Sequence, residues 1–592
     1  MVLKTLTRSV REYKLPSILT PIFMTGEVLL ECLIPLVIAR LINAANGNSL
    51  APVLKSGIIL IAMAACSLIF GTLSGRFAAR ASTGFAKNLR HDLFYKVQGF
   101  SFGNIDRFSS SGLVTRLTTD VTNVQNAYMM SIRMAVRFPL MLITALIMSF
   151  SVSIKMACIF LGIIPVLGVC MALLIWKAYP MFDSVFKQYD KLNDSVQENI
   201  KGMRVVKTYV REDFERKKFE NSAEDIRRNF VRPEKLLALS NPLMWFCIFA
   251  VIILISVFGA YLTVNTFGGF DAAGNPVWGE LSTGDISSLF IYSAQILSSM
   301  MMLAMVLVMI IMATASAKRI AEVLNEKSDI VSPENACREV ENGDVDFCGV
   351  SFKYAPDAEA EVLSGIELHI KSGETVGILG GTGSGKTSLV QMIPRLYDAC
   401  EGCVRVGGKD VKEYELEALR NSVAMVLQKN LLFSGSIEEN LKWGDENATR
   451  EEIQRAARLA CADEFVSSFP GGYDTHIEQG GTNVSGGQKQ RLTISRALLK
   501  KPKILILDDS TSAVDTRTDA LIRKAFREEI PGTTKIIIAQ RTASVMDADR
   551  IVVLDNGRIS GVGTHDELLK TNDIYREVYE SQNKAGGDED VA

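Results

Sequence analysis

A glycine-rich stretch in the second half of the chain has the residue types and spacing of a phosphate-binding loop. Its sequence, GGTGSGKT at Gly380–Thr387, follows the apolar run Thr375–Leu379 and precedes an expected helix. In this order the glycines let backbone N–H groups surround phosphate oxygens, while the lysine and the helix N-terminus add positive charge. We therefore expect ATP to bind through Gly380, Gly381, Thr382, Gly383, Ser384, Gly385, Lys386, Thr387 and Ser388.

A carboxylate suited to Mg²⁺ lies further along the chain. The apolar run Ile504–Leu507 ends in Asp508. A strand with a carboxylate at its C-terminal end is the usual partner of such a loop and holds Mg²⁺ beside the phosphates. The hydroxyl of Thr387 is the second expected ligand, so ATP with Mg²⁺ is the expected cofactor.

The elements that must position these residues have the pattern of an α/β domain. From about residue 345, short β-rich runs alternate with helical stretches, which is typical of a largely parallel sheet with crossover helices. We expect this domain at 345–585, after a linker at 321–344 and before a flexible tail at 586–592. The expected strands are Val345–Phe352, Thr375–Leu379, Ser422–Leu427, Ile504–Leu507, Lys535–Ala539 and Ile551–Leu554.

The preceding residues, 1–320, are rich in long apolar runs. A helix needs about 20 mostly apolar residues to cross a bilayer. Six segments meet that length, and the third and fourth are separated only by a tight turn at Ser153–Lys155. They lie near 16–42, 56–75, 134–153, 156–176, 239–264 and 286–313.

Charge in the connecting segments indicates the orientation. The two long loops, after the second and fourth apolar segments, are rich in Lys and Arg, whereas 265–285 has neither. The positive-inside rule places the N-terminus, both loops and the C-terminal domain in the cytoplasm of a multi-pass cell-membrane protein. Apolar residues at helical spacing predict that the membrane helices continue into these loops. Their turns, near Gly112–Asp120 and Gly202–Glu212, are the expected contacts with the C-terminal domain.

Overall composition narrows the function further. The formal net charge of −2 gives no electrostatic reason to expect a nucleic-acid partner. The ten cysteines lack the paired spacing of a zinc site or a disulfide framework, so we expect reduced cytosolic thiols. Residues 1–14 are polar and basic, and the apolar run behind them is too long for a cleavable signal.

Two features of the apolar segments bear on a transported substrate. Glu27 and Glu31 lie one turn apart in the first segment, where they would either attract a cationic substrate or pair with Arg133 and Arg137. In the sixth segment, one face carries flexible thioethers that suit varied apolar ligands or ordinary helix packing. These are Met301, Met305, Met309 and Met312.

Further motifs in the C-terminal domain resemble those of ABC ATPases. Val484–Gln488 matches the signature usually written LSGGQ, Gln428 matches the Q-loop glutamine, and Tyr354 matches the aromatic residue that stacks on adenine. Ser512–Asp515 resembles the D-loop. The order of six membrane helices and then the ATPase resembles half-transporters of the multidrug-exporter type.

That resemblance implies where ATP would lie. The nucleotide would be sandwiched between the Gly380–Thr387 loop of one subunit and the signature of another, with Ser485, Gly487 and Gln488 acting in trans. It also implies that Gln428 joins Thr387 and Asp508 at Mg²⁺. The implied fold is an α-helical membrane domain with long cytoplasmic extensions, fused to an α/β P-loop ATPase domain.

Two positions depart from the family pattern. Asp509 stands where the family has the glutamate that orients the attacking water, and its stem is one methylene shorter. Gln540 stands where the family has a histidine that touches the γ-phosphate, and an amide cannot relay a proton as imidazole does. Glu478–Gly481 also differs from the usual sequence before the signature. Together these changes resemble the degenerate-site subunit of a heterodimeric exporter, whose partner carries Glu and His.

The expected function is therefore ATP-driven export of hydrophobic or amphipathic molecules, such as drug-like compounds, lipids or peptides. One alternative is a homodimer that uses Asp509 as a slow base. Another is a channel or sensor that uses ATP only as a binding switch. The fused membrane segments argue against a soluble ABC protein of repair or translation, and importers usually keep the two parts on separate chains.

Overall fold

The computed structural model describes residues 2–46, 50–269, 276–355, 358–509 and 514–586. The chain divides into two compact units. The helical unit comprises 1–98 and 111–326, and the ATPase unit comprises 99–110 and 327–592. Each unit is described by itself.

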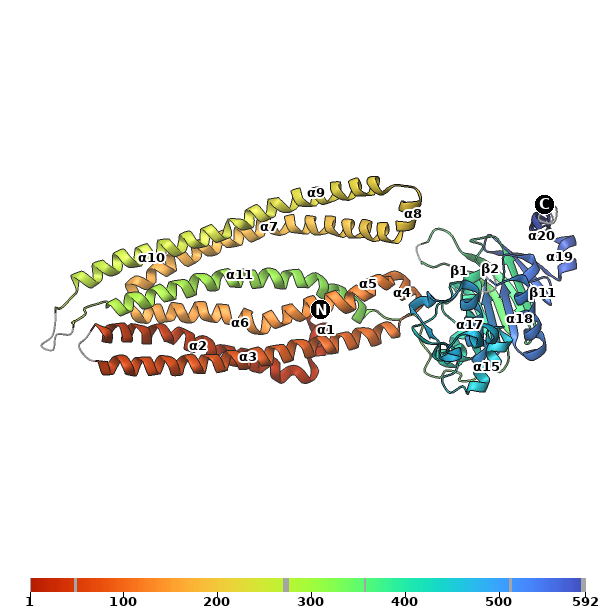
Figure 1. Ribbon diagram of the computed structural model, residues 1–592, viewed down its shortest axis with the longest axis horizontal. Helices are drawn as coiled ribbons and strands as arrows, with labels where there is room; N and C mark the ends of the chain where they lie inside the picture. The colour runs from red at the N-terminus through yellow and green to blue at the C-terminus, as the bar shows by residue number, and fades with distance from the viewer. Residues whose placement is uncertain (1, 47–49, 270–275, 356–357, 510–513, 587–592) are drawn as a thin grey trace. The chain divides into compact units, whose positions relative to one another are not determined.

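The helical unit is built from long helices that pack side by side (Figure 1). Within it α2 packs on α3, α6 packs on α11, and α7 packs on α9 and α10. Its elements are α1 Val2–Thr7, η1 Arg8–Tyr13, α2 Lys14–Ala45, α3 Leu50–Gln98, α5 Ser110–Thr115, η2 Arg116–Asp120, α6 Val121–Val152, α7 Ile154–Lys201, α8 Met203–Thr208, α9 Glu212–Ala238, α10 Ser240–Asn265 and α11 Thr283–Asn325.

The six expected membrane spans are confirmed as helices. Among the described residues, six helical stretches are long and apolar enough to cross a membrane. They are Val2–Ala45, Leu50–Gln98, Ser110–Val152, Ile154–Ala178, Glu212–Asn265 and Thr283–Asn325. Most extend well beyond the apolar segments, as the helical spacing in the loops predicts. Exposed apolar side chains such as Ile58, Ile61 and Leu68 suit a lipid surface.

Local sequence sets two of the helix boundaries. Ser153 has an extended backbone (φ −160°) and its hydroxyl accepts the Met156 N–H at the start of α7, which gives the tight turn after α6. Ser282 and Asp285 form a capping box at the start of α11, with hydrogen bonds of 3.1 and 3.0 Å. α11 then continues to Asn325, past the expected start of the linker at 321.

The ATPase unit contains a mainly parallel six-stranded sheet in the order β12-β11-β3-β10-β9-β6. β11, β3, β10, β9 and β6 are parallel to their neighbours, and only the edge strand β12 is antiparallel. All residues of β9 and β10 are buried, as expected for central parallel strands. The strands are β3 Thr375–Gly380, β6 Val423–Val426, β9 Ile504–Asp508, β10 Thr534–Ile538, β11 Arg550–Asp555 and β12 Arg558–Gly563.

The expected strand Val345–Phe352 lies outside this sheet. As β1 it joins a separate four-stranded antiparallel sheet in the order β2-β1-β4-β5. Its neighbour β2 alternates buried and exposed residues, the pattern of a sheet with one solvated face. The bounds are β1 Val345–Phe352, β2 Leu363–Ile370, β4 Glu401–Val406 and β5 Lys409–Asp410, and a small pair is formed by β7 Gly435–Ser436 and β8 His476–Ile477.

The helices of the ATPase unit are mostly short, and α17, α18 and α20 are the longest. They are α4 Phe102–Phe108, α12 Lys386–Gln391, η3 Val411–Glu413, α13 Leu416–Ser422, α14 Ile437–Leu441, α15 Arg450–Leu459, α16 Asp463–Ser468, η4 Gly472–Asp474, η5 Gln479–Gly481, α17 Gly486–Leu499, α18 Thr516–Glu529, η6 Thr542–Ser544, α19 His565–Thr571 and α20 Asp573–Gly586. The expected tail at 586–592 lies outside the described residues, apart from Gly586.

Candidate functional site

The glycine-rich loop leaves the C-terminal end of β3, between β11 and β10, and leads directly into α12. Gly383 and Gly385 have φ of 83° and 92°, a backbone conformation that favours glycine. A Cβ on Gly385 would lie 2.7 Å from Leu363 and 2.9 Å from the carbonyl oxygen of Val362. The loop therefore needs glycine both for its turn and for close packing against β2.

Lys386 lies at the start of α12 and is buried. Its Nζ donates hydrogen bonds to the carbonyl oxygens of Gly380 (2.8 Å) and Gly381 (2.7 Å). Burial lowers the pKa of Lys386, although the nearby carboxylates of Asp508 and Asp509 oppose this shift. An ammonium group destabilised by burial in this way is suited to a phosphate, which would supply the missing negative charge.

Thr387 and Asp508 come together as the sequence predicts. The Thr387 hydroxyl donates to both carboxylate oxygens of Asp508, at 3.1 and 2.9 Å. Burial raises the pKa of Asp508; Asp509 adds to this shift, and the Thr387 hydrogen bond and Lys386 oppose it. These oxygen donors fit Mg²⁺. Among the described residues no three His, Cys, Asp or Glu side chains form a metal site, so nucleotide oxygens and water would complete the coordination.

The two departures from the family pattern are in direct contact. Asp509 Oδ2 accepts a hydrogen bond from Gln540 Nε2 (3.2 Å) and a longer one from Gln428 Nε2 (3.5 Å). β10 brings them together because it lies parallel beside β9, with Ile538 opposite Asp508. Asp509 has a positive φ of 48°, which aspartate tolerates better than most residues. Gln540, two residues after the end of β10, therefore lies beside Asp509, the residue that follows β9.

Tyr354 lies close to the phosphate-binding loop. Its hydroxyl is 2.7 Å from the Ser388 hydroxyl, and its ring makes edge contacts with Phe352 and Tyr397. Half of its surface is exposed. The exposed part of the ring suits stacking with an adenine base.

The signature Val484–Gln488 forms an exposed, capped helix start. Ser485 Oγ accepts the Gln488 N–H (3.3 Å), and the Ser485 N–H donates to Gln488 Oε1 (2.9 Å). α17 follows, with Ser485 itself exposed. Within the described residues no hydrogen bond or ion pair joins this signature to the Gly380–Thr387 loop. Part of the expected D-loop, Ser512–Ala513, lies outside the described residues, and Asp515 caps α18 by accepting the Thr518 N–H.

The short helix α4, which comes from the first long loop and packs in the ATPase unit, was not anticipated from the sequence. The segment of the first long loop that belongs to the ATPase unit is Gly99–Ser110, which carries α4, and not Gly112–Asp120, which belongs to the helical unit. The Tyr397 hydroxyl donates to Asp106 (2.6 Å), and the Tyr397 and Phe102 rings lie 6.0 Å apart. Burial, with this bond to Asp106, raises the pKa of Tyr397. α4 has only seven residues and no long apolar run, so periodicity gave no signal for it.

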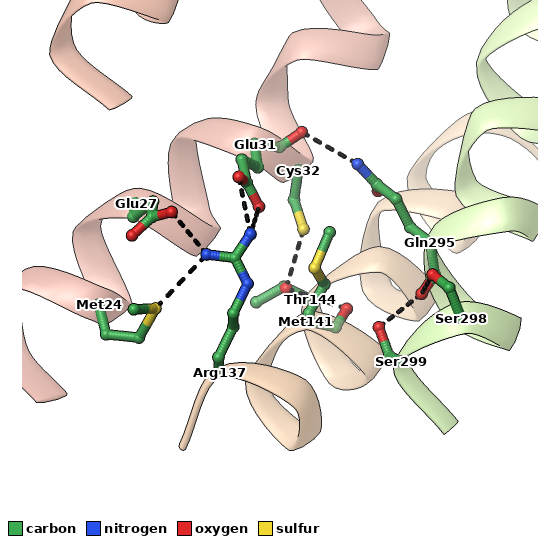
Figure 2. Close-up of polar contacts among 10 residues, drawn as sticks. All are labelled: Met24, Glu27, Glu31, Cys32, Arg137, Met141, Thr144, Gln295, Ser298 and Ser299. Carbon is green, nitrogen blue, oxygen red and sulfur yellow. Dashed lines mark hydrogen bonds and ion pairs between the residues drawn. The ribbon is translucent and has the colours of Figure 1, made fainter. Parts of the chain in front are cut away.

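The charged residues of the first apolar segment form an ion-pair cluster with α6 (Figure 2). Arg137 donates to Glu27 Oε1 (2.5 Å) and to both oxygens of Glu31 (2.9 Å). Arg133, in contrast, makes no ion pair with the described residues. Gly71 of α3 makes room for this cluster, because a Cβ there would lie 3.1 Å from the Glu27 carboxylate. Of the two interpretations, pairing with Arg137 is the one found.

Comparisons with known proteins agree with both units. The family model of the ABC transporter transmembrane region matches residues 18–274, and the ABC transporter model matches 363–512. The chain is 36% identical to "Uncharacterized ABC transporter ATP-binding protein YfiB" of Bacillus subtilis, over 97% of each chain. It is 33% identical to "Uncharacterized ABC transporter ATP-binding protein YknU" of the same organism, over 83% of this chain and 82% of the relative. A putative ABC transporter ATP-binding protein of Mycoplasma genitalium, MG014, is 30% identical over 93% of this chain and 89% of its own length. The chain therefore belongs to the ABC transporter family, as a membrane region fused to an ATPase that is coupled to transport.

Proposed function

We propose that this chain is one subunit of a heterodimeric exporter, and that its own phosphate-binding loop holds ATP but hydrolyses it poorly. Its signature, Ser485–Gln488, completes the hydrolytic site of a partner that carries glutamate and histidine at the positions of Asp509 and Gln540. The substrates are hydrophobic or amphipathic molecules that leave the cytoplasm across the cell membrane. The ATPase unit is on the cytoplasmic side.

The observation that carries this proposal is the contact between Asp509 and Gln540. A general base must be within hydrogen-bond reach of the water it activates. Asp509 has a stem one methylene shorter than glutamate, and its Oδ2 already accepts a hydrogen bond from the Gln540 amide. A displacement of about 1 Å can reduce a rate by roughly 100-fold. The neutral Gln540 amide adds no proton relay.

The nucleotide-binding residues themselves favour retention of ATP. Lys386 and the loop N–H groups would bind the phosphates, Thr387 and Asp508 would hold Mg²⁺ together with Gln428, and Tyr354 would stack on the base. Bound Mg²⁺ would neutralise phosphate charge and align the nucleotide. Every part needed for binding is thus present, and the changed residues are those that act on the γ-phosphate and the water.

The test is a substitution that affects the signature without affecting this chain's own loop. Ser485→Ala in the assembled pair should lower ATP turnover strongly, because the site that hydrolyses ATP loses a donor to the nucleotide. Ser436→Ala is the matched control, because Ser436 forms the same capping box with Glu439 on α14. A similar small effect from both variants would mean that Ser485 only caps its helix, and the proposal would then be wrong.

A second measurement separates the two subunits' sites. Asp509→Asn should change turnover of the assembled pair far less than the matching change at the partner's glutamate. Equal losses would favour a homodimer-like mechanism in which Asp509 serves as a slow base.

A further inference from the structure

The C-terminal helix α20 contacts the turn that carries Gln540. Gln582 Oε1 accepts hydrogen bonds from the Thr542 N–H (2.9 Å) and from the Thr542 hydroxyl (2.9 Å). Gln582 Nε2 donates to the carbonyl oxygen of Gln540 (2.8 Å). One side chain therefore makes three hydrogen bonds across two residues of this turn, 40 or more positions away in the sequence.

Packing fixes the position from which Gln582 reaches the turn. Asn572 starts α20 by accepting the Tyr575 N–H (2.9 Å), and Tyr575 is completely buried. Ile574 and Val578 pack against the hydrophobic core of the ATPase unit. Gln582 follows Val578 by four residues, so it lies on the same face of the helix. The apolar contacts at the start of α20 thus place the Gln582 amide, further along the same face of the helix, beside the Gln540–Thr542 turn.

The Gln540–Thr542 turn, which Gln582 anchors, lies next to the candidate nucleotide site. Gln582 binds the backbone of Gln540, while the side chain of Gln540 binds Asp509 Oδ2 at 3.2 Å. Thr542, two residues further along the chain than Gln540, is buried. The position of the Gln540 amide therefore depends on a backbone that is anchored at both of these residues by one side chain.

We propose that Gln582 is a positioning residue of the nucleotide site: it anchors the Gln540–Thr542 turn and so sets where the Gln540 amide meets Asp509 and the γ-phosphate. This inference rests on nucleotide binding by the chain's own Gly380–Thr387 loop, but not on a heterodimer. Loss of the anchor would free the Gln540 amide and weaken the contact that it would make with the γ-phosphate of bound ATP. Residues that would bind the base and the α- and β-phosphates would be unaffected.

Two substitutions of Gln582 test the hydrogen bonds to Thr542 and to Gln540 separately. Gln582→Ala removes all of them. Gln582→Glu keeps an acceptor for Thr542 but has no N–H for the Gln540 carbonyl, which it would instead repel. Glu577→Ala is the matched control, because Glu577 is exposed on α20 and its side chain makes no hydrogen bond or ion pair with the described residues.

The measurement is dissociation of fluorescent nucleotides from the purified full-length chain with Mg²⁺. One probe is an ATP analogue whose β–γ bridge resists hydrolysis, and the other is ADP. Both Gln582 variants should lose the same single hydrogen bond, the one from the Gln540 amide to the γ-phosphate. Loss of one hydrogen bond corresponds to about a fivefold change, so both variants should release the ATP analogue about fivefold faster. Release of ADP should change less than about twofold, and Glu577→Ala should change neither.

Amide hydrogen exchange gives a second readout. The Thr542 N–H should exchange faster in Gln582→Ala but stay protected in Gln582→Glu, which separates the anchor on Thr542 from that on Gln540. Unchanged release of the ATP analogue in both variants would overturn the proposal. Equal acceleration of both nucleotides would also overturn it, because a merely structural role of Gln582 affects the whole site. Because the ATP analogue is not hydrolysed, this result is independent of whether the wild-type chain hydrolyses ATP slowly or fast.

Discussion

At the scale of single residues, the membrane-spanning part contains a cluster of paired charges, formed by Glu27, Glu31 and Arg137. Arg137 serves two carboxylates, and Glu27 Oε2 is buried with no hydrogen-bond partner among the described residues. Removing one partner of a buried ion pair leaves the other charge without compensation, which destabilises a protein by about 3–5 kcal/mol. The cluster is therefore a strong determinant of stability in the helical unit.

Arg137→Met should lower the thermal unfolding temperature of the purified protein markedly. Adding Glu27→Gln and Glu31→Gln to this variant should restore most of the loss, since the cluster then carries no charge. Lys155→Met is the control, because its pair with Glu280 is exposed and such pairs contribute about 0–1 kcal/mol. If the Arg137 and Lys155 variants unfold at the same temperature, the cluster is not the determinant we describe.

An ion pair in the ATPase unit gives a prediction for the pH dependence of stability. Burial alone would raise the pKa of Glu374, but hydrogen bonds from Arg550 and from the Lys371 N–H outweigh it and hold the pKa below its usual range. A folded-state pKa below the unfolded value means that the stabilisation is complete above the unfolded pKa, about 4.3. It is lost as pH falls through the lower, folded value.

Arg550→Met should therefore be less stable than the wild type by a constant amount between about pH 6 and pH 8. The difference should shrink below about pH 4, as the Glu374 carboxylate becomes protonated first in the folded variant and then, at lower pH, in the folded wild type. Thermal unfolding of the full-length wild type and the Arg550→Met variant, from below about pH 4 to about pH 8, measures this difference in stability. A difference that grows on acidification would have the wrong sign for this pair.

At the scale of elements, the contacts of α4 with the rest of the ATPase unit include a hydrogen bond and a ring contact with Tyr397, and a hydrogen bond from Asn104 to the Lys327 carbonyl. Tyr397→Phe keeps the ring but removes the bond to Asp106, so amides of Phe102–Phe108 should exchange with solvent several-fold faster, as for the loss of one hydrogen bond. Tyr414→Phe is a suitable control, because it removes a hydroxyl bond to the Val406 carbonyl elsewhere in the same unit. Equal exchange of α4 in both variants would contradict a specific role of Tyr397.

Elements differ in how well the sequence predicts them. The six long helices follow from hydropathy, because a bilayer requires a continuous apolar run. The strand before the glycine-rich loop follows from its motif, because glycine spacing and a buried strand occur together. β1 could be recognised as a strand but not assigned to its sheet, since pairing depends on distant β2 and β4. α4 could not be predicted, because a seven-residue helix held by tertiary contacts has no periodic signal.

The residues of the candidate site also differ in how well the sequence predicts them. Thr387 and Asp508 were expected together because the loop and the strand-end carboxylate form a known chemical pair. The Asp509–Gln540 contact follows only from the parallel pairing of β9 and β10. Gln582 had no local signal at all, because its role depends on where a helix packs and not on any motif. Chemistry is thus predictable from spacing, whereas positioning depends on tertiary packing.

At the scale of the whole molecule, the chain combines a membrane region with an ATPase coupled to transport. We propose that each of its nucleotide sites is formed by the phosphate-binding loop of one chain and the signature of another. A signature that is exposed in one chain and a loop that retains its binding residues are compatible with sites formed between two chains. In the heterodimer that we propose, Asp509 and Gln540 would limit hydrolysis at one of the two sites. Two copies of this chain still offer an intact signature to each loop, so restoring both residues should restore hydrolysis without any partner.

The most direct measurement is the steady-state ATP turnover of the purified full-length chain in lipid bilayers, compared with its Asp509→Glu/Gln540→His variant. We predict slow turnover for the wild type and at least about tenfold faster turnover for the double variant, because glutamate recovers the missing reach of about 1 Å and histidine the missing proton relay. Rapid turnover by the wild-type chain that Asp509→Asn abolishes would contradict the account, since Asp509 would then be a competent base.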